Sequence, residues 1–142
     1  MKRRAKFWRY ILTAEVLTTI GFANMARKLL EKSLKNVLGT DEPHRLAAVY
    51  AAQASVEERC GDIAKASALL EKAIEVAPVD EVSLRHFDLA VLQEKQRNYQ
   101  AAVSHLSMAL HLLDSSVSQE CREDIQTKLN ECREKVSSLP VL

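Results

Sequence analysis

The chain has few of the residues that interrupt helices or cross-link a fold: three glycines, three prolines and three cysteines in 142 residues. An odd, sparse set of cysteines excludes the disulfide framework of a small secreted domain. No stretch reaches about 18 apolar residues, which excludes a membrane-spanning helix. No secretory leader is evident either. We therefore expect an intracellular protein, cytoplasmic or nuclear.

The scarcity of glycine also excludes a phosphate-binding loop, because each glycine stands where a helix is expected to end. No nucleophile signature or metal-ligand spacing is present. Cys121 and Cys132 are eleven residues apart, and the four histidines include no pair at a spacing of four. We expect no enzymatic activity, no cofactor and no metal, and we expect the cysteines to be buried structural residues.

Helix-forming residues dominate the composition instead. Apolar residues recur at helical spacing, which predicts seven helices near residues 7–20, 23–37, 43–60, 62–77, 81–96, 99–113 and 117–137. No segment shows the period-two alternation of a strand. The sequence therefore predicts an all-α chain.

Residues suited to helix ends lie between these segments. Gly21 and Gly61 are predicted to end helices in the left-handed conformation. Ser116, with Gln119 three residues later, resembles a capping box for the last helix. Three further residues are predicted to cap helix starts with a side-chain oxygen: Asp62, Asp80 and Asn98.

One pattern recurs along the chain. The runs LLEKSL at 29–34 and LLEKAI at 69–74 lie forty residues apart, and residues 106–110 form a third, weaker copy. Each copy has an alanine, a large apolar residue and a small residue at matching points: Ala26, Leu30 and Ser33; Ala66, Leu70 and Ala73; Ala102, Leu106 and Ala109. Self-similarity at a period of 20–50 residues indicates a repeat array.

This spacing resembles the tetratricopeptide repeat. The middle copy, residues 47–80, matches the family's signature best, at Tyr50, Ala54, Gly61, Ala66, Leu70, Ala73 and Pro78. The third copy departs from the signature at His86, where the family favours Trp, and at Asp114, where it favours Pro. The resemblance implies one domain over residues 1–142, with repeats at about 7–40, 47–80 and 83–116 and a capping helix at 117–137. It also implies antiparallel helix pairs that stack into a short right-handed α-solenoid of about seven helices.

In tetratricopeptide-like folds the first helix of each pair lines a concave groove. The resemblance implies these groove residues: Trp8, Ile11, Leu12, Glu15, Ala51, Ala52, Ser55, Leu84, Phe87, Asp88 and Val91. Members that hold a partner's C-terminal carboxylate have Lys, Arg and Asn at such positions, so we reject that mode here. An apolar groove suits a helical or extended segment of another protein. The favoured function is therefore a non-catalytic scaffold or adaptor for protein–protein interaction.

Several alternatives stay open. The groove residues are also compatible with cover by the chain itself or by a neighbouring repeat. The chain is also compatible with a self-associating structural subunit, such as a homodimer, that uses its first or last helix. Alternatively, the aromatic residues at 7–10 and the basic run after Met25 faintly resemble the half-a-tetratricopeptide repeats of RNA-processing factors.

Charge is unevenly distributed. Residues 1–40 hold nine basic and two acidic residues, whereas residues 41–142 hold eleven and seventeen. An anionic partner would contact the basic residues at the start of the chain: Lys2, Arg3, Arg4, Lys6 and Arg9. The simpler interpretation is that they solvate the first helix. Nucleic acid is not the favoured partner, because the basic residues do not recur through the repeats.

Overall fold

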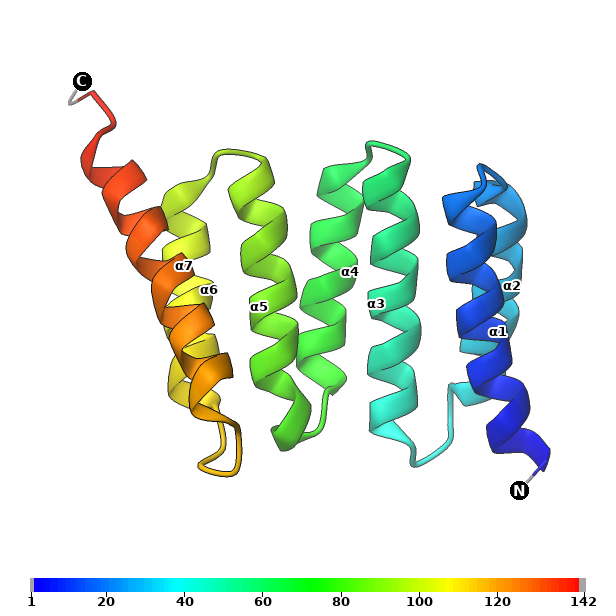
Figure 1. Cartoon of the computed structure of the whole chain (residues 1–142). Helices are drawn as coiled ribbons and strands as arrows, with labels where there is room; N and C mark the ends of the chain where they lie inside the picture. The colour runs from blue at the N-terminus through cyan, green and yellow to red at the C-terminus, as the bar shows by residue number, and fades with distance from the viewer. Residues whose placement is uncertain (1, 141–142) are drawn as a thin grey trace. The chain divides into compact units, whose positions relative to one another are not determined.

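The structure is a computed structural model that describes residues 2–140, and side chains from Ala5 to Pro140. Over this range the chain is all-α, with seven helices and no strand (Figure 1). The helices are α1 (Lys2–Thr19), α2 (Ala23–Val37), α3 (Pro43–Arg59), α4 (Ile63–Val76), α5 (Val79–Lys95), α6 (Tyr99–Leu112) and α7 (Gln119–Ser137). The predicted helices are confirmed, although α1 begins five residues earlier than its apolar pattern suggested.

Contacts between helices divide the chain into two compact units, one up to Ala77 and one from Pro78 onward. In the first unit, α1, α2 and α3 pack against one another, and α3 also packs against α4. In the second unit, α6 packs against both α5 and α7. Each unit therefore has its own core.

Both cores are built on helix faces with apolar residues at helical spacing. The core of the first unit includes Phe7, Ile11, Ala14, Ala26, Leu30, Val37, Val49, Ala52 and Val56. The core of the second includes Ala90, Ala102, Leu106, Ile125, Leu129 and Cys132. Every member of the three repeated triplets found in the sequence is buried, with an exposed fraction of 6% or less.

The same turn follows α1, α3 and α5. Gly21 and Gly61 have φ angles of 93° and 86°, and Arg97 has 61° at the matching point of the third turn. In each turn the residue with positive φ and its successor donate their N–H groups to helix carbonyls three and five residues earlier. This Schellman arrangement satisfies carbonyl groups that would otherwise be free at the helix end. The predicted role of both glycines is confirmed.

The helices that follow the Gly61 and Arg97 turns, α4 and α6, have the predicted caps. The carboxylate of Asp62 accepts a hydrogen bond from the N–H of Lys65 at 3.1 Å, and the amide oxygen of Asn98 accepts one from the N–H of Ala101 at 3.4 Å. Both bonds satisfy a donor in the first helical turn.

Two cap predictions are wrong. α5 begins directly after Pro78, because the fixed φ of proline suits a helix start, and Asp80 therefore lies inside the first turn. α7 is capped by Ser118, whose hydroxyl accepts from the N–H of Cys121 at 3.3 Å. The predicted cap, Ser116, is instead held in the preceding loop, where its N–H donates to the carboxylate of Asp114 at 3.2 Å.

Candidate functional site

The predicted groove residues of α1 lie on two different faces. Ile11 is buried in the core of the first unit, with an exposed fraction of 6%. Trp8 and Leu12 are exposed at 45% and 61%, and Glu15 is exposed as well. Packing separates the two sets, because the neighbouring helices cover the side of α1 that holds Ile11 and leave the side centred on Leu12 exposed.

The exposed apolar residues of α1 form a continuous row. Trp8, Leu12 and Val16 are four residues apart, so they lie on successive turns of one face, and Val16 is 59% exposed. We call these three residues the α1 stripe. On a helix, Arg9 and Glu15 lie at opposite edges of this stripe, and both side chains are exposed. The stripe therefore offers apolar area with a cation on one side and an anion on the other.

The remaining predicted groove residues contribute little exposed apolar area. On α3, Ala52 is buried in the core, Ala51 is half-buried and Ser55 is exposed, with its hydroxyl donating to the carbonyl of Ala51 at 3.3 Å. On α5, Leu84 is 52% exposed, whereas three residues are half-buried: Phe87, Asp88 and Val91. Phe87 packs against the core of the second unit.

The basic residues at the start of the chain are described only in part. The side chains of Lys2, Arg3 and Arg4 lie outside the described residues. Lys6 and Arg9 are exposed. The Lys6 ammonium lies 5.9 Å from the centroid of the Tyr10 ring, a cation–π contact within α1.

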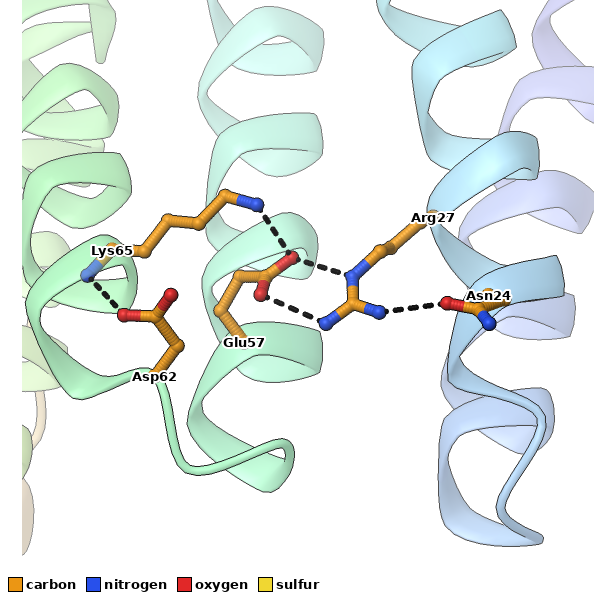
Figure 2. A network of polar contacts seen from close by, with 5 residues as sticks. All are labelled: Asn24, Arg27, Glu57, Asp62 and Lys65. Atoms are coloured by element: carbon orange, nitrogen blue, oxygen red, sulfur yellow. Dashed lines mark hydrogen bonds and ion pairs between the residues drawn. The ribbon is translucent and has the colours of Figure 1, made fainter.

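A buried carboxylate links three helices of the first unit, as Figure 2 shows. Glu57 of α3 has a side chain only 5% exposed and receives two hydrogen bonds from the Arg27 guanidinium of α2, at 2.9 and 3.0 Å. The Lys65 ammonium of α4 lies 3.2 Å from the same carboxylate, and Arg27 also donates to the amide oxygen of Asn24 at 2.9 Å.

These hydrogen bonds explain the electrostatics of the network. Hydrogen bonding from Arg27 lowers the pKa of Glu57, and Lys65 lowers it further, while burial acts in the opposite direction. The carboxylate is therefore ionised near neutral pH with its oxygens occupied. Such a group ties helices together and leaves no free oxygen pair for acid–base chemistry.

A pocket of about 540 Å³ lies in the first unit, among α1, α2, α3 and the loop before α3. Lys6 and Tyr10 contribute to its wall from α1, Lys32 and Ser33 from α2, and Arg45 from α3. Sequence patterns did not single out this pocket. Two of its wall residues carried a signal: Lys6, which was predicted to contact an anionic partner, and Ser33, which occupies the repeat position that Ala73 and Ala109 hold in the other two copies.

The cysteines and histidines form no metal site among the described residues, where no group of three or more His, Cys, Asp or Glu side chains converges. Cys132 is buried as predicted, but Cys60 and Cys121 are exposed, because both lie at helix ends rather than on a core face. His86 and His105 stack in the second unit, with their Nδ1 atoms 3.1 Å apart.

No protein-family model matches the sequence. No curated protein matches it either. In the part of the chain that the structure describes, no helix is long and apolar enough to cross a membrane.

Proposed function

We propose that the chain is a tetratricopeptide-like scaffold in which antiparallel helix pairs stack into a short right-handed α-solenoid. Three Schellman turns at matching points, each followed by a buried Ala, Leu and small-residue triplet, support this proposal. Repeats of this kind need neighbours to bury their apolar faces, which favours stacking.

The proposed function is non-catalytic binding of a partner protein through the α1 stripe. The observation that supports it is the exposure of Trp8, Leu12 and Val16 on one helix face. Exposed apolar rows bordered by charge are typical of surfaces that receive an amphipathic helix. Arg9 and Glu15 would set the direction of that helix, by pairing with an acidic and a basic side chain on the partner.

The test compares two substitutions at adjacent exposed positions of α1. Leu12→Glu places a charge in the stripe, whereas Thr13→Glu places the same charge off the stripe. Both leave the buried face unchanged, unlike a substitution at Ile11. Proteins captured from a cell extract by the wild-type chain and by Thr13→Glu, but not by Leu12→Glu, would be candidate partners.

A peptide from the captured protein must then bind in isolation. Trp8 is the only tryptophan in the chain, so its fluorescence reports directly on the stripe. We expect saturable binding that Leu12→Glu weakens at least tenfold and Thr13→Glu leaves nearly unchanged. Equal binding to both variants would contradict the proposal. Mass that rises with concentration and is lost in Leu12→Glu would instead indicate self-association through the stripe.

A further inference from the structure

The pocket of the first unit differs from the α1 stripe in both place and chemistry. Its volume of about 540 Å³ lies within the range of small-molecule sites. Neither Trp8 nor Leu12 contributes to its wall, because Lys6 and Tyr10 lie on another face of α1. An inference about this pocket is therefore independent of the proposed protein partner.

Positive charge dominates the pocket. The ammonium groups of Lys6 and Lys32 each lie 5.9 Å from the Tyr10 ring centroid, and neither has a carboxylate partner among the described residues. The Arg45 guanidinium pairs with Glu42 at 2.8 Å and lies 5.3 Å from the Phe7 ring centroid. Three cations against one carboxylate leave a net charge of +2.

Two buried polar atoms in the wall residues have no hydrogen-bond partner: the Ser33 hydroxyl oxygen and Arg45 Nε. Ser33 is 1% exposed and the side chain of Arg45 is 7% exposed. Unpaired buried polar atoms are costly, so a native structure that keeps them calls for an explanation. A ligand anion bound near Ser33 and Arg45 would be attracted by the positive charge of the Arg45 guanidinium and by the dipole of the Ser33 hydroxyl group.

The loop between α2 and α3 forms part of the pocket wall. It spans residues 38–42, longer than the two residues between α4 and α5, and it contributes Thr40 and Glu42 to the wall. The aromatic ring of Tyr10 and the methyl groups of Val37 supply an apolar part of the wall. The pocket therefore combines a cationic region with a surface for a flat or apolar group.

We propose that this pocket binds a phosphomonoester carried on an aromatic body, with the phosphate held by Lys6, Lys32 and Arg45. A phosphate monoester has a charge of about −1.5 to −2 at pH 7, which matches the net charge of the pocket. Its three terminal oxygens accept hydrogen bonds from ammonium and guanidinium donors. The ring of the ligand packs against Tyr10.

The probe is phenyl phosphate, titrated into the full ¹⁵N-labelled chain at low and at physiological salt. We expect saturable amide shifts in α1, α2 and the start of α3. Benzenesulfonate, which has a single negative charge on the same ring, should bind at least fivefold more weakly. A phosphotyrosyl peptide distinguishes the source: tighter binding than phenyl phosphate assigns the phosphate to a protein side chain, and equal binding assigns it to a small molecule.

A matched pair of substitutions on α2 tests the site. Lys32→Glu reverses a charge in the pocket, and Lys28→Glu reverses another exposed charge one turn away that does not contribute to the wall. We expect Lys32→Glu to weaken phenyl phosphate binding at least tenfold and Lys28→Glu by less than twofold, with the helical circular dichroism unchanged. No saturable shift, or equal weakening by both variants, would overturn the proposal.

Discussion

The two units use the same turn chemistry but anchor their helices differently. In the first unit a carboxylate with a 5% exposed side chain, Glu57, accepts two bonds from one guanidinium. In the second, the carboxylate of Glu94 is 18% exposed and pairs with two lysines of α7, Lys128 and Lys135. A planar guanidinium fixes the direction of its partner, whereas two ammonium groups act as point charges. The pair of Glu57 and Arg27 therefore depends more strongly on the relative orientation of its side chains than the lysine pairs of Glu94 do.

A second difference concerns buried hydroxyl groups. Ser83 of the second unit donates to the carbonyl of Ala109 at 2.6 Å, across α5 and α6. The hydroxyl of Ser33 in the first unit has no such partner. The second unit thus satisfies its buried serine internally, while the first leaves one unsatisfied beside a charged pocket.

The largest expected effect comes from replacing the leucine that both units bury at the same repeat position. Leu30 and Leu106 occupy matching repeat positions and are fully buried. Replacing either with alanine should lower the free energy of unfolding by about 2–5 kcal/mol, because the cavity cannot close completely. Denaturant unfolding measures the loss, and hydrogen exchange of the helices in the altered unit locates it. Leu12→Ala, at an exposed position, is the control, with a change of about 0.5 kcal/mol or less.

The next prediction compares the contributions of Glu57 and Glu94 to the free energy of unfolding. Glu57→Gln should lower the free energy of unfolding by about 1.5–3 kcal/mol, the usual contribution of a hydrogen bond to a charged group. Glu94→Gln should cost about 1 kcal/mol or less, because its pairs are more exposed to solvent. Equal losses, measured by urea unfolding at pH 7, would show that burial does not distinguish the anchors.

The same comparison has a pH dependence. Hydrogen bonds from Arg27 and from Lys128 lower the pKa values of Glu57 and Glu94 below the ordinary 4.5. The unfolded chain therefore takes up these protons first. The stability from both groups is present above pH 4.5 and is lost as pH falls through the folded pKa values. Each glutamine variant should lose less stability than the wild type between pH 6 and pH 3.

The buried serines give effects of opposite sign. Ser33→Ala should raise the free energy of unfolding by about 1 kcal/mol, because it removes an unsatisfied hydroxyl and restores the residue that the other copies hold. Ser83→Ala should lower it by about 1 kcal/mol, because the carbonyl of Ala109 loses its side-chain donor. Thermal unfolding of both variants measures the signs. A destabilised Ser33→Ala would mean that the hydroxyl is satisfied in solution.

The turns provide a smaller test. Gly61 has φ 86° and open space where a Cβ would lie, so Gly61→Ala should cost about 1 kcal/mol from backbone strain alone. Arg97 adopts φ 61° with a side chain present, so Arg97→Gly should gain about 0.5 kcal/mol after the entropy cost of glycine. Chemical unfolding of the two variants should show these opposite signs, and a gain for both would contradict the shared turn geometry.

The sequence predicted those features that depend on a few adjacent residues. The glycine turns and the caps at Asp62 and Asn98 were confirmed, because a positive φ or a side-chain acceptor is a local requirement. The predicted cap of α7 was wrong, because Ser116 and Ser118 offer the same side-chain chemistry and the backbone N–H of Ser116 is held by the Asp114 carboxylate in the preceding loop.

The candidate sites depended on packing that the sequence does not contain. Ile11 and Leu12 are both apolar, yet one is buried and the other is exposed, because neighbouring helices cover only one of the two faces. The pocket was still harder to predict from the sequence, because it brings Lys6, Lys32 and Arg45 together from three helices. Two of its features were visible along the chain: the departure at Ser33, and Lys6, which was predicted to contact an anionic partner.

The smallest expected effect concerns the second unit alone. Burial, and then the charge of the stacked His105, lowers the pKa of His86 below its ordinary 6.5, so folding favours the neutral ring. Stability from this group is therefore present above pH 6.5 and is lost as pH falls through the folded pKa. Glu57 and Glu94 stay ionised in this range, so a decline in thermal stability between pH 7 and pH 5 should disappear in His86→Phe. A decline that persists in that variant would assign the effect to another group.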